Sequence, residues 1–448
     1  MNKWKRGIAI AGLLLIALFF LPFLVPTSAY IGQAEGFASE KLGVPVEIGN
    51  VQLAILPTPR VNINNIVIGQ KQELKVVRVA VLPSLTSLFS DTKVISSLHI
   101  EQPVLKKAAV DVVAGIIKKL SEDKSPSTAI VREITIKETR LEWPGMNLPA
   151  FNAVVAMSEA SKPQSALIDT TDGKLRLRLA PSDKDWQAIK LEAKNWTMPV
   201  GQSLLIDEMQ ANMKLYDNRL EITDLNAGLY GGRVNGKAVL NWDKDWRLSG
   251  SLKVNELAVR EPARLFSKTT RVSGLLFTNG SFSAKAKEAG HLMEHVNAGF
   301  RFKIKDGVLY GMDLTKAATI LLKQGQSGGE TQFDELSGLL NVSGKQYHFS
   351  DLNIVSGLMA ANGDVKIRPN KELDGVVEVE VKRGVALAGI PLQVSGTVDN
   401  PQLFPTKAAM AGAVVGTAVL GPGVGTGLGI KAGSAMEKLK GLFSTDKN

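Results

Sequence analysis

The sequence predicts a mainly β protein: an N-terminal transmembrane helix, then an extended, curved antiparallel sheet with a few short helices, and a glycine-rich apolar tail. Three observations carry this prediction. A long uncharged segment lies near the N-terminus, most of the 448 residues show strand-like alternation of apolar and polar side chains, and a second charge-free segment lies near the C-terminus. Aromatic residues make up only 6% of the chain, so the apolar positions are mostly Val, Ile, Leu and Ala. Val and Ile favour strands.

The N-terminal segment predicts a membrane anchor. Gly7 to Val25 holds no charge, and nineteen residues of helix rise about 28 Å, close to the thickness of a bilayer's hydrocarbon core. Basic residues before it predict a cytoplasmic N-terminus and an exported body. The alternative is a signal peptide cleaved near Thr27-Ser28-Ala29. The predicted anchor residues are basic or large and apolar: Lys3, Lys5, Arg6, Leu13, Leu14, Leu15, Phe19 and Phe20.

The body begins with mixed elements and continues as strands. Ala29–Lys41 and Ala108–Leu120 have helical patterns, and Val94–Val104 is predicted to form one of the strands between them. From residue 130 on, short strands follow one another with glycine-containing turns, which predicts a meander of neighbouring antiparallel strands. Phe300–Lys305 is one such strand, and Asp306-Gly307 is predicted to form the hairpin turn after it.

One face of this sheet is predicted to be apolar. Left open, such a face exposes more contiguous apolar area than a soluble monomer tolerates. Either the protein's own helices cover it, which gives an inert β domain, or acyl chains cover it, which gives a lipid groove. The candidate groove residues are alternate apolar positions of three strands: Leu175, Leu177, Leu179, Phe300, Phe302, Ile304, Val377, Val379 and Val381.

The C-terminal apolar segment predicts a possible second membrane contact. Ala408 to Ile430 contains no charge, and its glycines recur at a spacing that lets apolar helices approach closely in lipid. A flexible tail that caps the sheet is the alternative. The glycines concerned are Gly412, Gly416, Gly421, Gly425 and Gly429.

Composition and motifs give no reason to expect catalysis. The chain has no cysteine, so thiolate chemistry and cysteine-based metal sites are excluded. The formal charge of +10 is spread along the chain, unlike the concentrated basic surface of a nucleic-acid-binding protein. His291-Leu-Met-Glu-His295 has the spacing of an inverted zinc-peptidase motif, but it lies in a polar connector that is better explained as a solvated linker. We therefore expect no enzyme activity, no metal, no cofactor and no nucleic-acid partner.

Several segments share their sequence and order with a known family of envelope proteins. Near the N-terminus they are Leu42–Val51, Leu56–Pro59 and Asn65–Gly69; toward the C-terminus they are Phe302–Leu314, Thr331–Leu336, Asp351–Ile354, Ala361–Asp364 and Ile390–Pro401. With the predicted anchor, the chain resembles the AsmA-like family of Gram-negative envelope proteins. Residues 130–255 resemble the family only in their general pattern of alternating strands and turns. The body is far shorter than that of the largest, bridge-forming members, and Phe89-Ser-Asp91 replaces a usual glycine.

The resemblance implies a single-pass inner-membrane protein whose periplasmic β-groove holds phospholipid or other acyl lipids. The implied role is lipid transport or homeostasis between the envelope membranes. The alternative is an envelope scaffold or assembly factor that binds outer-membrane or periplasmic proteins and fills the sheet with its own side chains. The predicted organisation is an anchor (1–27), an N-terminal α+β module (28–120), a linker (121–127), a middle meander (128–255), a C-terminal β domain (256–405) and a helical tail (406–448).

Overall fold

The computed structural model describes residues 28–89, 93–122, 129–144, 147–159, 163–180, 186–199, 203–264, 272–319, 328–382 and 389–412. The chain divides into two compact units, Met1–Ser203 and Leu204–Asn448. This division falls inside the predicted segment 128–255, and the finer predicted boundaries stay a prediction. The predicted anchor (1–27) and Gly416, Gly421, Gly425 and Gly429 lie outside the described residues.

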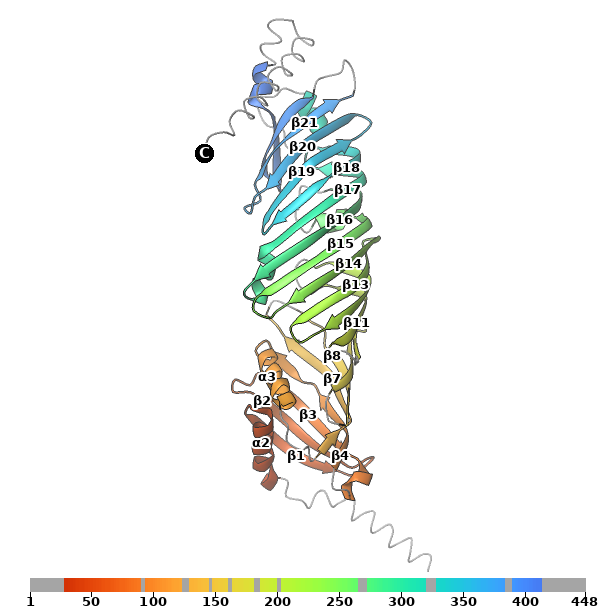
Figure 1. The fold of residues 1–448 in the computed structure, drawn as a ribbon, viewed down its shortest axis with the longest axis vertical. Helices are drawn as coiled ribbons and strands as arrows, with labels where there is room; N and C mark the ends of the chain where they lie inside the picture. The colour runs from red at the N-terminus through yellow and green to blue at the C-terminus, as the bar shows by residue number, and fades with distance from the viewer. Residues whose placement is uncertain are drawn as a thin grey trace, which may run out of the picture. The chain divides into compact units, whose positions relative to one another are not determined.

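Unit 1 begins with a helix that packs against the first three strands, which are antiparallel to one another (Figure 1). The elements are α2 (Ser28–Leu42), β1 (Val46–Ala54), β2 (Arg60–Ile68) and β3 (Leu74–Pro83). α2 also occupies part of the free edge of β1, because Ser39 Oγ and Glu35 Oε1 accept hydrogen bonds from the N–H groups of Val46 and Ile48, at 2.9 and 2.7 Å. Unpaired strand edges invite further strands, and these two contacts block that end of β1.

A helical crossover follows, which the predicted all-antiparallel sheet did not include. Its elements are η1 (Leu85–Phe89), β4 (Lys93–Glu101), β5 (Val104–Lys106), α3 (Ala109–Glu122) and β6 (Ala129–Val131). β4 and β5 run parallel to β7 (Glu133–Glu142), because a chain that returns through a helix enters the sheet in the same direction. The single strand predicted over 94–104 is divided at Gln102-Pro103, where Gln102 has φ +50° and Pro103 has no N–H to donate.

The rest of unit 1 is a meander, as predicted. Its strands are β7, β8 (Phe151–Met157), β9 (Pro163–Thr170), β10 (Leu175–Ala180) and β11 (Gln187–Thr197), each antiparallel to the next. Two ion pairs lie on their polar faces: Arg176 Nε of β10 pairs with Asp169 Oδ1 of β9 at 2.5 Å, and Lys190 Nζ pairs with Glu192 Oε1 within β11 at 2.7 Å. The hydrogen bond from Lys190 lowers the pKa of the Glu192 carboxyl, and Asp169 raises the pKa of the Arg176 guanidinium.

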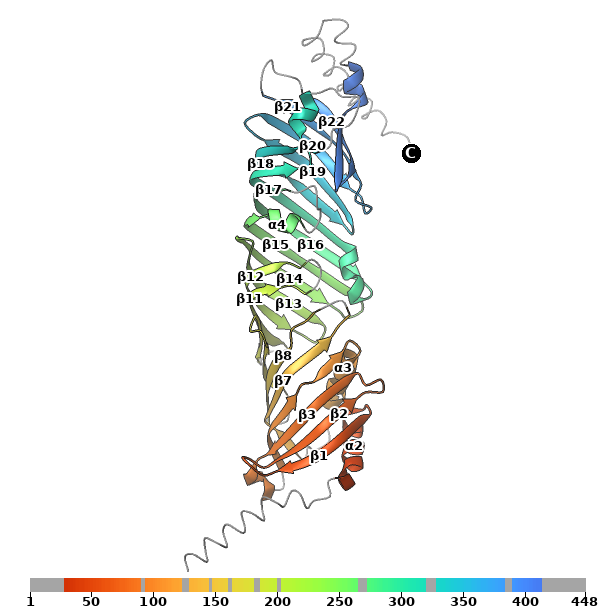
Figure 2. The ribbon, with the colours of Figure 1, turned by 180° about the vertical axis from the view of Figure 1, so that it is seen from behind.

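Unit 2 is a meander of strands, each antiparallel to the next in sequence (Figures 1 and 2). Its strands are β12 (Leu205–Leu215), β13 (Arg219–Leu229), β14 (Gly232–Asn241), β15 (Trp246–Ala258), β16 (Leu275–Ala286), β17 (Val296–Tyr310), β18 (Glu330–Ser343), β19 (Gln346–Val355), β20 (Met359–Ile367), β21 (Leu373–Val381), β22 (Ile390–Thr397) and β23 (Asn400–Pro405). The short helices α4 (Arg260–Ala263), η2 (Ala289–His295) and α5 (Leu314–Thr319) interrupt them. The predicted meander is confirmed here.

The last strand is a poor template for another strand. Thr406 N donates a hydrogen bond to Pro391 O at 3.0 Å, so Thr406 directs its backbone polar groups toward β22. Because this direction alternates along a strand, the backbone polar groups of Pro401, Leu403 and Pro405 point away from β22, toward the free edge. Two of these residues are prolines without an N–H, and Leu403 is buried. Prolines at a sheet edge oppose edge-to-edge pairing.

The hairpin turn predicted at Asp306-Gly307 is wrong, because β17 continues through both residues. Lys305 pairs with Glu335 and Gly307 with Phe333, so the same two strands stay paired on either side of Asp306. Asp306 takes φ +51°, a left-handed conformation that Asp tolerates better than most residues. Gly307 is needed for close approach, since a Cβ there would collide with the Ser273 carbonyl oxygen and the Phe333 ring.

We expect Gly307→Ala to lower the free energy of unfolding by about 1–3 kcal/mol, the usual result of overpacking. Gly290→Ala is the control, because a Cβ at Gly290 would meet nothing within 4 Å and should change stability by less than about 0.5 kcal/mol. Urea denaturation of the two variants measures the difference. Equal stability of the two would show that β17 has room at this position.

Candidate functional site

The predicted groove residues of unit 1 lie on a half-buried apolar face. Leu175, Leu177 and Leu179 of β10 are each half-buried, whereas Arg176 and Arg178 between them are exposed. Leu177 pairs with Ile168 of β9 and Leu191 of β11, which are also half-buried. The leucines therefore belong to an apolar row that crosses β9 to β11, with the ion pairs on the opposite face.

The predicted groove residues of unit 2 are placed differently, within a packed core. Phe302, Ile304, Val377 and Val379 belong to one buried cluster, and Val381 packs against it. Helix α5 contributes Leu314, Ala317 and Ala318 to this cluster, and helical residues 407–412 contribute Ala409.

Packing in this cluster is close. Val379 is 0% exposed, and the Phe302 and Phe349 rings meet edge to face with their centroids 5.9 Å apart. Phe300 is half-buried. Much of this part of the predicted groove is therefore filled by the protein's own side chains.

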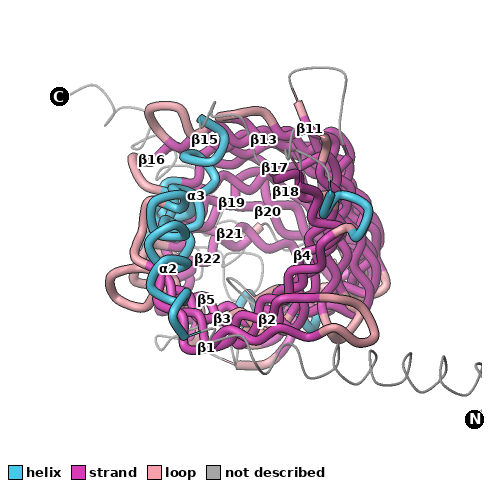
Figure 3. Tube along the Cα trace, turned by 90° about the horizontal axis from the view of Figure 1, so that it is seen from below, coloured by secondary structure: helices cyan, strands magenta, loops and turns pink. Residues whose placement is uncertain are grey.

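Unit 1 contains an apolar cavity of about 480 Å³ between its helices and its sheet. This volume lies within the range of small-molecule sites, about 300–1,000 Å³. Helices α2 and α3 contact each other beside the sheet (Figure 3). Lys119 Nζ of α3 donates a hydrogen bond to the Glu40 carbonyl oxygen of α2, which joins the two. The lining is almost wholly apolar: Ala38, Leu42, Val46, Ile48, Ile63, Ile66, Ile68, Leu74, Val76, Val79, Ile100, Pro103, Leu105, Val113, Ile116, Ile136, Thr139 and Phe151.

Local sequence explains how this lining forms. On α3, Val113 and Ile116 recur at helical spacing and face the cavity, while Val110 is 44% exposed. On β2, Ile63 and Ile66 both line the cavity although they are three residues apart, because Asn65 between them takes φ +54° and changes the strand's alternation. The helical pattern of Ala108–Leu120 predicted α3, but the cavity was not predicted. The sequence signal that could have revealed the cavity was the apolar face that α3, β2 and β3 each present.

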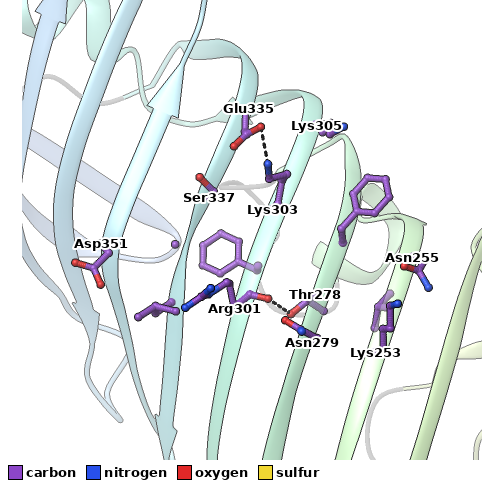
Figure 4. Close-up of a pocket in the computed structure, with 15 residues that line it drawn as sticks. Lys253, Asn255, Thr278, Asn279, Arg301, Lys303, Lys305, Glu335, Ser337 and Asp351 are labelled. Atoms are coloured by element: carbon purple, nitrogen blue, oxygen red, sulfur yellow. Dashed lines mark hydrogen bonds and ion pairs between the residues drawn. The ribbon is translucent and has the colours of Figure 1, made fainter.

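A second pocket, of about 650 Å³, lies on unit 2, and most of the residues that line it are polar or charged (Figure 4). Arg301, Lys303 and Lys305 of the pocket alternate along β17 with the buried Phe302 and Ile304. These three charged side chains therefore project from the other face of the sheet. Lys303 Nζ pairs with Glu335 Oε2 at 3.0 Å, and Lys305 Nζ lies 5.5 Å from the centre of the Phe277 ring. The main polar residues are Lys253, Asn255, Asn279, Arg301, Lys303, Lys305, Glu335, Ser337 and Asp351. This surface is suited to weak attraction of anions and is separate from the apolar cavity.

The two histidines of the zinc-peptidase-like motif do not share a helix face. They lie in η2, a 3₁₀-helix with three residues per turn. Side chains four residues apart in such a helix point in directions that differ by about a third of a turn. Both are exposed, and Leu292 between them is buried in a small cluster with Ala284 and Ala286. In the part of the chain that the structure describes, no group of three His, Cys, Asp or Glu residues is placed to hold a metal ion.

Within the described ranges, no helix combines the length and the apolar character that a membrane span requires. Gly412 ends the described part of the predicted tail, in a helical turn that follows β23.

Comparison with known proteins shows that residues 131–344 match the family model described as the AsmA family. The matched region runs from the end of β6 to the turn after β18 and so contains strands of both units. It includes residues 131–255, for which the sequence alone had indicated only a general likeness to the family. Neither the curated proteins nor the solved structures contain a match to this chain.

The two classes of predicted groove residue should respond differently to a buried charge. Val379→Asp places a carboxyl in the packed core and should lower the free energy of unfolding by about 4 kcal/mol or more. Leu177→Asp lies on the half-buried face and should cost roughly 1–2 kcal/mol. Urea denaturation with circular dichroism measures both. A Val379→Asp protein as stable as Leu177→Asp would show that the core around β21 is loosely packed.

Proposed function

Since the chain is an AsmA-like protein, we propose that it binds lipid acyl chains in the apolar cavity of unit 1. Family membership and the large β-sheets fit an envelope role of the lipid-transport type. In this proposal the half-buried apolar row on β9 to β11 carries chains beyond the cavity. The protein then contributes to phospholipid transport or homeostasis between the envelope membranes, without catalysis.

The observation that carries the proposal is the chemistry of the cavity. An apolar cavity of this size excludes headgroups and ions, because burying a charge without a partner is costly. It accepts methylene groups, each of which gains about 0.8 kcal/mol on leaving water. A sixteen-carbon chain gains on the order of 10 kcal/mol, about as much as in a bilayer. Such a site lowers the barrier to leaving a membrane but supplies no direction.

The proposed location follows from the sequence. Residues 1–27 anchor the protein in the inner membrane with the N-terminus in the cytoplasm, and the body lies in the periplasm. The cavity lies between elements that begin soon after this segment, since α2 starts at Ser28. An anchored protein would therefore receive acyl chains near the membrane that holds it.

A second candidate function is favoured by the packed core of unit 2. A scaffold or assembly factor for outer-membrane proteins is expected to fill its sheet with its own side chains, and the cluster under α5 does so. A photo-crosslinking residue at Leu177 separates the two functions: adducts with lipid support transport, and adducts with protein support the scaffold.

The lipid content of purified protein tests the proposal. Ile116→Trp places a larger side chain into the cavity from α3 and should reduce co-purifying lipid several-fold, measured by mass spectrometry of solvent extracts. Val110→Trp is the matched control, because it adds similar bulk at an exposed position of the same helix and should leave lipid content unchanged.

Thermal unfolding of both variants shows whether the fold is retained. A folded Ile116→Trp protein that carries as much lipid as the control would exclude the cavity as the site. Wild-type protein free of lipid after gentle purification would count against acyl-chain binding altogether.

A further inference from the structure

One polar group interrupts the apolar cavity of unit 1. Thr139 is 3% exposed and lines the cavity, and its hydroxyl oxygen has no hydrogen-bond partner. In the described part of the chain, it is the one buried side-chain nitrogen or oxygen in this condition. A buried hydroxyl without a partner is destabilising, and most such groups in folded proteins are satisfied. The hydroxyl therefore requires an explanation.

The backbone of β7 brings Thr139 to this position. Ile136 pairs with Ala153 and Thr139 with Phe151, so β7 uses three residues where β8 uses two, which is a β-bulge. Glu138, at the bulge, takes φ +54° and is exposed. Regular alternation from Ile136 would instead have turned position 138 toward the cavity. Bulges of this kind redirect side chains next to functional sites.

Contacts on the exposed side hold this arrangement. The Glu138 carboxylate accepts a hydrogen bond from Gln102 Nε2 at 2.8 Å, and the Glu138 N–H donates to Asn152 Oδ1 at 2.9 Å. Glu138 is therefore fixed on the outside of the sheet while Thr139 occupies the inside. The polar residue in the cavity results from a defined backbone feature.

Water is a poor partner for this hydroxyl. A buried water molecule usually makes about three hydrogen bonds, and the other side chains that line the cavity offer none. An ionised carboxylate is a poor partner as well, since nothing in the lining compensates its charge. A neutral carbonyl oxygen is suited to the site, because it accepts one hydrogen bond and carries no net charge.

We propose that rotation about its Cα–Cβ bond turns the buried Thr139 hydroxyl into the cavity, where Oγ1 donates a hydrogen bond to the ester carbonyl of a bound lipid acyl chain. This inference rests on the proposed function and names its ligand as an esterified chain. The strands run in the order β1, β2, β3, β5, β7. Four strand spacings of about 4.8 Å separate Thr139 from β1 by about 19 Å, room for an extended long chain. The ester end lies at β7 and β8, and the methyl end lies toward α2 and β1.

An ester lipid and its ether analogue test this inference in the full-length protein. The probes are dipalmitoyl phosphatidylglycerol and the di-O-hexadecyl ether lipid with the same headgroup, which lacks the carbonyls. Native mass spectrometry of an equimolar mixture should show wild-type protein preferring the ester about threefold to tenfold, the range of one net hydrogen bond.

Two variants of nearly the same shape complete the experiment. Thr139→Val removes the hydroxyl and should abolish the preference, while lipid-free Thr139→Val should be at least as thermally stable as wild type. Thr139→Ser keeps the hydroxyl and should keep the preference.

The outcomes distinguish the inference from the proposed function. Equal binding of ester and ether by wild type, or a preference that persists in Thr139→Val, overturns the role of Thr139 and leaves acyl binding in place. Binding of neither lipid by wild type overturns both. The wild-type ratio alone decides the inference if Thr139→Val does not fold.

Discussion

The apolar face of a β-sheet must be kept from water, and the rest of this structure depends on how that is achieved. Side chains alternate across a strand, so a strand with one polar face necessarily presents an apolar one. In unit 2, α5, Ala409 and the strands' own side chains close the apolar face into a core that includes Met359 and Leu392. In unit 1, α2 and α3 cover the face without filling the space beneath them. The same constraint therefore yields a packed core in one unit and a cavity in the other.

Because unit 2 has a packed core and unit 1 has a cavity, residues with the same sequence pattern have different roles in the two units. Leu177 and Val379 occupy equivalent places in alternating strands, yet one is half-buried and the other is 0% exposed. A packed position contributes to stability, because any ligand there would have to displace protein atoms that already fill the space. A half-buried apolar position retains surface for a partner. The acyl-chain binding proposed above therefore concerns unit 1, whereas the buried residues of unit 2 contribute to stability.

Departures from regular alternation are what shape the cavity. Asn65 and Glu138 adopt left-handed conformations within β2 and β7, and each changes which residues of its strand face inward. Such conformations are unfavourable for most L-residues and persist when the surrounding structure holds them. At Glu138 the contacts with Gln102 and Asn152 do so. The result is a cavity whose one polar side chain, Thr139, has a defined position.

The sequence by itself determined most of the strands, the meander and the resemblance to the AsmA family, because these depend on local alternation, on turn residues and on the order of recognisable segments. It placed α2 and α3 close to their observed bounds. Only the tertiary structure decided which apolar residues are covered, since coverage of β21 comes from α5, more than fifty residues away in the chain. Nor does any local pattern distinguish the kink at Asp306 from a hairpin turn, because Asp-Gly suits both and the pairing of β17 with β18 selects one. The unpartnered hydroxyl of Thr139 likewise exists only once β5, β7, β8 and α3 come together.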